Sequence, residues 1–207
     1  MIYDILTDSN GLMSIIAKGI KRKKDGLSMQ PFKEIQLSFT KAKLPLLTKH
    51  EVLHSYTHVS KKYMLLGLYF NELIYKLIPK NEPLLSLFNL YKDQLYYMSN
   101  VNISPENMLL RFEYLFLKEI GYEISLIYED NYLIDKSKKY YYEFGQGFKE
   151  LNTNADKKTI VSGESIYNLF NNKFELINDT KKFRYIAKNI INENLGHKSI
   201  KSYDILD

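Results

Sequence analysis

The chain has 207 residues, 45% of them hydrophobic, and its 29 Lys and Arg exceed its 24 Asp and Glu to give a net charge of +5. This length and composition suit one large or two small globular domains with a real core, and they argue against a largely disordered chain. Cysteine is absent, which excludes disulfides, a thiol nucleophile and zinc sites built on thiolates. Neither a signal peptide nor a run of about 18 apolar residues occurs, so we expect a soluble, cytoplasmic protein without membrane contact.

The pattern of the first 55 residues predicts short strands. Residues 2–6 and 12–17 flank a turn sequence ending in Asn10-Gly11, which is typical of a hairpin. Residues 34–39 alternate apolar and polar side chains, the period of a half-buried strand. Residues 44–53 supply a fourth candidate, with Pro45 at its edge or at a bend. Several short strands in a small segment indicate a barrel or a sandwich.

After about residue 58 the apolar residues recur at steps of three and four, which predicts helices. The first helix ends before Pro79, and the second follows Pro83. A third helix begins at Ser104-Pro105, with Ser as N-cap, and ends before Gly121. The chain therefore changes from a small β module to a larger helical one.

The polar stretch 129–154 interrupts the helices and contains a predicted small hairpin, residues 140–148, around a Gly-Gln-Gly turn. Ser162 is expected to cap a short helix that runs through Phe170. Asp179 or Thr180 is expected to begin a longer helix that ends at Gly196. The fold class is therefore α+β.

Positive charge is concentrated at the amino-terminal end. Residues 1–50 hold nine Lys or Arg against four acids, while the rest of the chain balances at 20 against 20. The segment 18–24 alone places five positive side chains in seven residues. Such asymmetry suggests a polyanion-binding module, with nucleic acid as the commonest polyanion. The alternative is an ordinary solvated loop.

Four collinear stretches resemble one protein family. They are GLMSIIAKG at 11–19, followed by KRKK at 21–24 and MQPF at 29–32; GLYFNEL at 67–73; LRFE at 110–113, closing with IGY at 120–122; and LGHKSIKS at 195–202. Together they resemble the RecO family of bacterial recombination mediators. The resemblance implies an OB-fold DNA-binding domain, residues 1–55, and a helical protein-interaction domain, residues 56–207.

The resemblance further implies a function in DNA repair without enzyme activity or cofactor. It implies binding of single- and double-stranded DNA, strand annealing, contact with the C-terminal tail of the single-stranded-DNA-binding protein SSB, and partnership with RecR in loading RecA, at the nucleoid. We expect the DNA backbone to be bound by the basic side chains of the first module, because these neutralise phosphates. They are Lys18, Lys21, Arg22, Lys23 and Lys24.

The sequence departs from the family pattern in three places. Relatives usually carry a further strand before the position of Met1, so the OB-like barrel is incomplete unless upstream codons supply that strand. The four-cysteine zinc motif of some relatives is missing, which makes this a zinc-free member without a metal site. Some relatives have two arginines where this chain has Leu110-Arg111, so Arg111 is the one residue here to which SSB-tail binding is assigned.

Two other function classes compete with a DNA-binding mediator. One is a protein adaptor that binds SSB and RecR but little DNA. The other is a nuclease that uses the acids Glu129, Asp130 and Asp135, although these lack EF-hand spacing and solvated charge is the simpler interpretation. No P-loop, nucleophile elbow or zinc-protease motif supports an enzyme.

Further candidates have structural alternatives. His50, His54 and His58 recur every fourth residue, but the first two fall in a predicted strand, where that spacing does not build a metal site. Asn71 and Glu72, inside an apolar helix, are expected to make polar contacts with another element.

Aromatic side chains that could stack on bases are also candidates. For Tyr3 and Phe32 both alternatives remain, stacking on bases and burial in the core, while Phe39 is expected in the core. Residues 140–142, three consecutive tyrosines, are interpreted as alternate faces of a strand.

Overall fold

A computed structural model describes residues 1–18, 29–57, 60–100, 103–122, 124, 134–151 and 155–206. The internal contacts divide the chain into two compact units, Met1–Asn102 together with Ile200–Asp207, and Ile103–Ser199. The carboxyl-terminal segment thus belongs to the same unit as the amino-terminal strands. A functional boundary near residue 55 stays a prediction.

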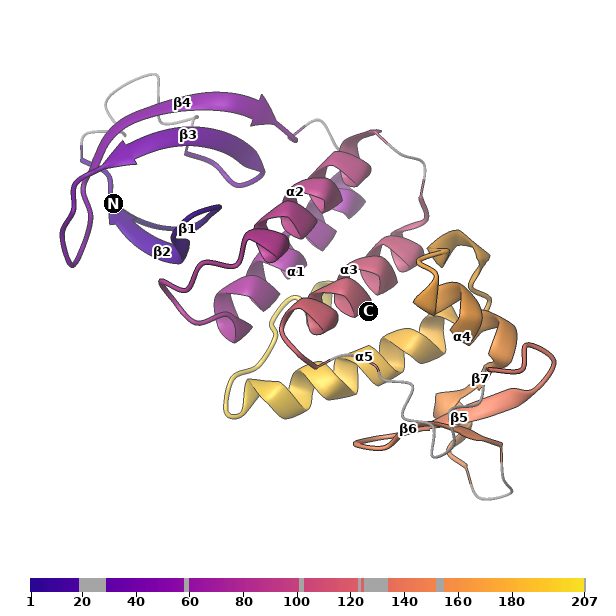
Figure 1. The fold of residues 1–207 in the computed structure, drawn as a ribbon. Coiled ribbons are helices and arrows are strands. Elements are labelled where there is room, and N and C mark those ends of the chain that lie inside the picture. The colour runs from indigo at the N-terminus through magenta and orange to yellow at the C-terminus, as the bar shows by residue number, and fades with distance from the viewer. Residues whose placement is uncertain are drawn as a thin grey trace. The chain divides into compact units, whose positions relative to one another are not determined.

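Unit 1 begins with two antiparallel hairpins (Figure 1). Their strands are β1 (Ile2–Thr7), β2 (Gly11–Ile16), β3 (Lys33–Phe39) and β4 (Leu47–Ser55). Gly11, which begins β2, has φ +66, and a Cβ there would lie 1.9 Å from the Glu82 carbonyl oxygen, so only glycine fits this turn. All four strands fall where the alternation pattern and the turn residues predict them.

The two hairpins share a small core but do not form a closed barrel among the described residues. An isolated parallel bridge joins Ile16 to Leu46. Beneath it lie the buried side chains of Met13, Ile15, Ala17 and Met29, with Tyr3, Ile5, Ile35, Phe39 and Leu47 packed around them and only partly buried. The expected α+β class is confirmed, and the OB-like part is open on one side.

Helices α1 (Lys61–Leu77) and α2 (Leu85–Asn100) complete most of unit 1 and lie side by side (Figure 1). The Tyr91 hydroxyl donates to the Asn71 side-chain oxygen at 2.5 Å, which joins the two helices. Phe32 is 7% exposed and has φ +65. Its ring lies so close to Gly67 that a Cβ on that glycine would be 2.6 Å from the ring. Phe32 therefore anchors the strands to α1 and is a core residue.

The carboxyl-terminal segment returns to α1. The Glu72 carboxylate accepts the backbone N–H groups of Lys201 and Ser202, both at 2.9 Å, and also the Ser202 hydroxyl. Lys76, one turn along α1, lies 3.0 Å from the same carboxylate. The short helix α6 (Tyr203–Leu206) follows, with the Tyr203 ring 5.7 Å from the Tyr69 ring. The expected polar contacts of Asn71 and Glu72 are thus confirmed.

Unit 2 packs three helices with a small sheet. The helices are α3 (Pro105–Glu119), α4 (Gly163–Phe170) and α5 (Thr180–Leu195). The sheet has the order β6 (Gly147–Glu150), β5 (Lys139–Glu143), β7 (Ile160–Ser162), all antiparallel. Two short 3-10 turns, Lys157–Thr159 and Phe174–Leu176, complete the unit. The hairpin and the three helices were predicted, whereas β7 was not.

The helix ends of unit 2 confirm the expected caps with one change. Ser104 and Ser162 accept N–H groups at the starts of α3 and α4, and Gly196 has φ +58 after α5. Asp179 stands at the N-cap position of α5, but its carboxylate instead accepts the Ser162 N–H at 2.9 Å and the Ser162 hydroxyl at 3.0 Å. Burial acts to raise the pKa of Asp179, but these hydrogen bonds and that from Lys182 lower it. Asp179 therefore connects the starts of the two helices.

None of the helices within the described ranges is long and apolar enough to cross a membrane. Tyr140 and Tyr142 are 1% and 6% exposed on β5, so the tyrosine run belongs to the strand and its core, as interpreted from the sequence.

Candidate nucleic-acid interface

The basic segment predicted from the sequence begins at the end of β2. Lys18 is exposed and follows Ala17, a buried core residue. Lys21, Arg22, Lys23 and Lys24 lie outside the described residues. The chain re-enters the described part at Met29, which is again buried in the small core. The basic segment is therefore bounded on both sides by residues of one β core.

The structure brings a second group of lysines to the end of β2. The Ile16 N–H donates to the Pro45 carbonyl at 2.8 Å, which ties the end of β2 to the connection between β3 and β4. Lys41 and Lys43 are exposed on that connection. Lys18 and Lys43 thus stand two residues from either side of one backbone contact, which gathers positive charge at this end of the sheet.

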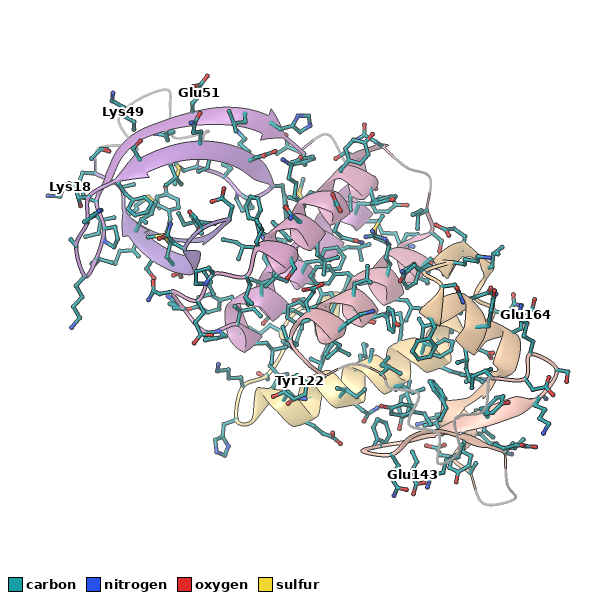
Figure 2. The ribbon with its side chains drawn as sticks, viewed as in Figure 1. Lys18, Lys49, Glu51, Tyr122, Glu143 and Glu164 are labelled. Atoms are coloured by element: carbon teal, nitrogen blue, oxygen red, sulfur yellow. The ribbon has the colours of Figure 1, made fainter. Side chains whose placement is uncertain are left out.

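A fourth exposed lysine, Lys49, projects from β4 with Glu51 on the same face (Figure 2). Lys18, Lys41, Lys43 and Lys49 make no ion pair with any acid in the described part of the chain. In the sequence, Lys41, Lys43 and Lys49 contribute to the charge excess of residues 1–50 but carry no pattern that assigns them to a site. Their position on one hairpin is the additional information that the fold supplies.

Two acids of the same unit are paired with lysines outside this group. Lys80 lies 2.6 Å from the Asp4 carboxylate, and Lys92 lies 2.6 Å from that of Glu34. Burial acts to raise the pKa of Asp4, but hydrogen bonds from Lys80 and Ser14 lower it. The hydrogen bond to Glu34 raises the pKa of Lys92. These pairs neutralise two acids without using Lys18, Lys41, Lys43 or Lys49, so these two acids do not cancel the charge of the exposed lysines.

The aromatic candidates do not form an exposed stacking platform. Phe32 is buried against α1, and Tyr3 and Phe39 pack against the small β core. The core position expected for Phe39 is therefore confirmed. These three rings therefore do not support base stacking beside the lysines. The chemistry that remains for this surface is the attraction between the lysine side chains and the phosphate groups of the nucleic acid.

The competing metal sites find no support in the described residues. His50 and His54 lie on β4, His58 is outside the described residues, and the His54 ring packs 4.4 Å from that of Tyr56. No group of three metal-ligating side chains gathers within the described ranges. Asp135 accepts the Ser137 N–H at 2.9 Å and its hydroxyl at 2.7 Å, which lowers the Asp135 pKa. Asp135 thus shapes a turn, while Glu129 and Asp130 are outside the described residues.

Arg111, the candidate for an acidic peptide, lies half-buried on α3, next to the fully buried Leu110. The same helix carries a feature that the sequence did not reveal. Glu113 is fully buried and pairs with Arg184 of α5, whose Nε and Nη2 atoms lie 3.2 and 3.3 Å from the two carboxylate oxygens. This pair joins α3 to α5. Because the carboxylate and the guanidinium neutralise each other, we interpret the pair as a structural contact.

Comparison with known proteins gives one consistent result. The family model described as "Recombination protein O C terminal" matches residues 62–150. A DNA repair protein RecO from Cellvibrio japonicus is 22% identical over 99% of this chain and 89% of its own length. The RecO proteins of Hamiltonella defensa and Nitrosospira multiformis are 28% and 24% identical, over 98% and 100% of this chain and 88% and 87% of their own lengths. Since these matches run through both compact units and agree with the family model, they support the RecO family as the family of this chain.

Proposed function

We propose that the protein acts in recombinational DNA repair as a non-enzymatic mediator that binds DNA and promotes strand annealing. The observation that carries this proposal is the set of exposed lysines near the end of β2 that make no ion pair with the acids the structure describes, in the segment 1–50, which holds the whole net charge of the chain. The names of the relatives, DNA repair proteins, support the same process.

The proposed mechanism is electrostatic. The basic residues of segment 18–24, with Lys41 and Lys43, bind phosphates and release counterions, which gives affinity without sequence preference. Two complementary strands held by such a surface repel each other less, so pairing can nucleate. No hydrolysis or cofactor is required for this step.

The protein partners follow from the family. We assign the SSB C-terminal tail to the helical part, with Arg111 as the cation for its acidic end, and RecR as the partner in loading RecA. An Arg111→Ala variant should bind a tail peptide more weakly in a fluorescence anisotropy titration. Unchanged affinity would remove Arg111 from the proposal.

The DNA contact is tested by titrating a labelled single strand at several salt concentrations. Replacing Lys21, Arg22, Lys23 and Lys24 together by Ala should weaken binding to all sequences alike. The slope of log affinity against log salt should flatten by roughly 0.7 per lost phosphate contact on a single strand. Lys41→Ala with Lys43→Ala should have a smaller effect in the same direction.

The matched control replaces two exposed lysines of unit 2, Lys157→Ala with Lys181→Ala, and should leave affinity and slope unchanged. Circular dichroism confirms that each variant is folded. Unaltered DNA affinity in the quadruple variant would mean that segment 18–24 is only a solvated loop.

A protein adaptor with little DNA affinity is the second candidate, and the open β part favours it because the described strands do not complete a barrel. The same titration separates the two functions. Binding of the SSB-tail peptide without any salt-dependent DNA binding would identify the adaptor.

A further inference from the structure

The chain passes between its two compact units twice. The first passage, at residues 102–103, connects α2 to α3, and the second, at residues 199–200, connects α5 to the carboxyl-terminal segment 200–206, here called the strap. Residues 196–199, which precede the strap, are all exposed. Between Leu195 and Ile200 the chain spans at most roughly 18 Å. The place where the strap is bound therefore limits how far the end of α5 can move.

The two passages are attached to unit 2 at well-separated points. The starts of α3 and α5 lie together, because the Thr180 hydroxyl donates to the Asn107 side-chain oxygen at 3.1 Å. The second passage leaves from the other end of α5, which has 16 residues and is therefore roughly 24 Å long. A body held at one point can turn about that point, whereas a body held at two points this far apart can turn only about the line between them. A bound strap therefore restricts the rotation of unit 2.

The strap is bound mainly by one side chain of α1. The Glu72 carboxylate accepts the N–H groups of Lys201 and Ser202, both at 2.9 Å, and also the Ser202 hydroxyl. Besides these bonds, Ile200 is buried and the Tyr203 ring lies against α1. The strap is thus held by a small apolar contact and by three hydrogen bonds that share one acceptor group.

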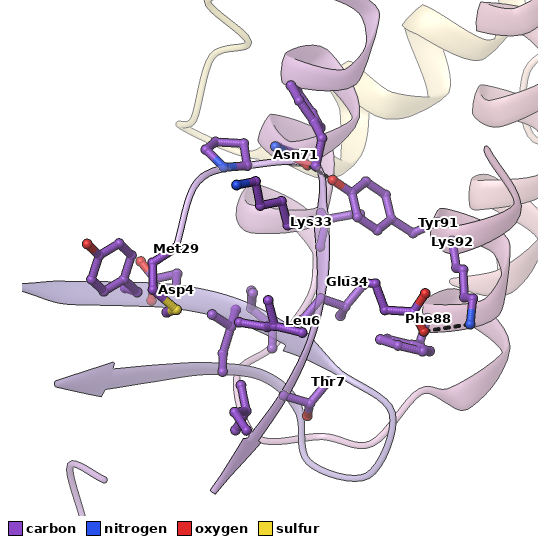
Figure 3. A pocket seen from close by; sticks show the side chains of 18 of the residues that line it. Asp4, Leu6, Thr7, Met29, Lys33, Glu34, Asn71, Phe88, Tyr91 and Lys92 are labelled. Carbon is purple, nitrogen blue, oxygen red and sulfur yellow. Dashed lines mark hydrogen bonds and ion pairs between the residues drawn. The ribbon is translucent and has the colours of Figure 1, made fainter. Parts of the chain in front are cut away.

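Helix α1 has other contacts that do not involve the strap. Asn71, the residue before Glu72, accepts the Tyr91 hydroxyl of α2 at 2.5 Å, and both residues line a cavity of unit 1 (Figure 3). Phe32 packs on Gly67 of the same helix. These contacts hold α1 in place whether or not the strap is bound. The strap can therefore open as a local unit of low stability while the rest of unit 1 stays folded.

We propose that the strap is a latch that switches the protein between two conformations. In the closed conformation Glu72 holds the strap on α1, and both passages restrain unit 2. In the open conformation the strap leaves α1 without unfolding of either unit, and unit 2 turns about the passage between α2 and α3 alone. The latch does not depend on the proposed function. If unit 1 binds DNA and unit 2 binds a protein partner, as proposed above, opening the latch lets these two ligands move apart.

Amide hydrogen exchange of the unaltered chain tests whether the strap opens locally. The N–H groups of Lys201 and Ser202 donate to Glu72, so they exchange when the strap leaves α1. Phe70 and Leu73 lie on the fully buried face of α1, so their N–H groups exchange when unit 1 unfolds. The two pairs of amides therefore report on two different opening reactions if the strap is a latch.

The strap amides should exchange faster than the helix amides at pH 7. After correction for intrinsic exchange rates, we expect a difference of at least about tenfold. Urea at low concentration should accelerate exchange of the helix amides but hardly that of the strap amides, because local opening exposes little surface. Equal rates with equal urea dependence would show that the strap opens only when unit 1 unfolds, which would overturn the latch.

Two matched variants test whether Glu72 holds the strap. Ser202→Asp places a second carboxylate against that of Glu72, and the repulsion between like charges should open the strap. Ser86→Asp adds the same charge at an exposed position of α2. Exchange at the Lys201 N–H should accelerate at least about tenfold in Ser202→Asp and keep the parent rate in Ser86→Asp. If Ser202→Asp leaves the Lys201 exchange rate unchanged, Glu72 does not hold the strap and the proposal fails.

Spin labels test whether the strap restrains unit 2. The chain has no cysteine, so labels attach only at the introduced Asn89→Cys and Asn192→Cys, exposed positions of α2 and α5. The distribution of distances between the two labels should broaden in Ser202→Asp and in a chain truncated after Ser199. A label pair within unit 1, Asn89→Cys with Lys49→Cys, should keep its width. A distribution that is unchanged in both variants, or already as broad in the parent, would contradict the latch. If circular dichroism shows that neither variant folds, the exchange comparison in the unaltered chain decides the question.

Discussion

The attachment of the carboxyl-terminal segment to α1 depends on one carboxylate, that of Glu72. Burial alone would raise the pKa of Glu72, but the hydrogen bonds from the Ser202 hydroxyl, the Lys201 N–H, Lys76 and the Ser202 N–H lower it from 4.5 to about 2. The ionised form is thus favoured by the folded state. Glu72→Gln removes the charge, keeps the shape and leaves one acceptor for these donors.

The expected magnitude follows from the linkage between protonation and folding. The difference between 4.5 and about 2 corresponds to at most about 3 kcal/mol, since one pKa unit is about 1.4 kcal/mol. The Glu72 side chain is 16% exposed, so solvent screening reduces this figure, and we expect Glu72→Gln to lower the free energy of unfolding by about 1–2 kcal/mol at pH 7.

The pH dependence gives the sharper measurement. A carboxylate with a lowered folded-state pKa stabilises the protein above its unfolded-state value, and this stabilisation is lost as the pH falls from about 4.5 to about 2. Urea unfolding followed by circular dichroism should therefore show a parent-to-variant difference that is full at pH 6 and shrinks below pH 4. Amide exchange at Lys201 and Ser202 should be faster in the variant at pH 6.

The matched control is Glu51→Gln, an exposed carboxylate on β4, which should change stability little. A difference between the parent and Glu72→Gln that stays constant from pH 6 to pH 2 would refute the electrostatic reasoning. It would mean that Glu72 acts through packing rather than through its charge.

Other variants test contacts within each unit by urea unfolding. Gly67→Ala forces a methyl group against the Phe32 ring and should lower the free energy of unfolding by about 1–3 kcal/mol; no loss would show that the ring can move. Glu113→Ala leaves Arg184 buried without its partner and should lower it by about 3–5 kcal/mol, whereas Glu113→Leu with Arg184→Met should recover much of this loss. Ser162→Ala removes the α4 cap and should lower it by about 1 kcal/mol, and an unchanged value would contradict the capping role.

The elements that the sequence predicted are those whose signals are local. Ser104 and Ser162 cap the helices that their positions indicate, and the Asn10-Gly11 turn joins the predicted hairpin. Capping and turn chemistry need only a few neighbouring residues. Such features can therefore be recognised in one sequence without knowledge of the rest of the fold.

The contacts that sequence analysis missed join distant residues. Strand β7 has only three residues and exists because it pairs with β5, so it carries no period of its own. Asp179 has the sequence signature of a helix cap, but in the folded protein its carboxylate accepts a hydrogen bond from Ser162 instead. Glu72 contacts Ser202, which lies 130 residues further along the chain. Residue periodicity contains no information about contacts at such a sequence separation.

The candidate DNA surface combines local and tertiary information. Its charge can be counted along the sequence before any fold is known. Its position depends on a tertiary contact, because the hydrogen bond from the Ile16 N–H to the Pro45 carbonyl places Lys43 near the end of β2, from which Lys18 follows. Charge patterning could therefore predict that the amino-terminal part binds a polyanion, but only the fold shows that Lys41 and Lys43 belong to the same end of the sheet as Lys18.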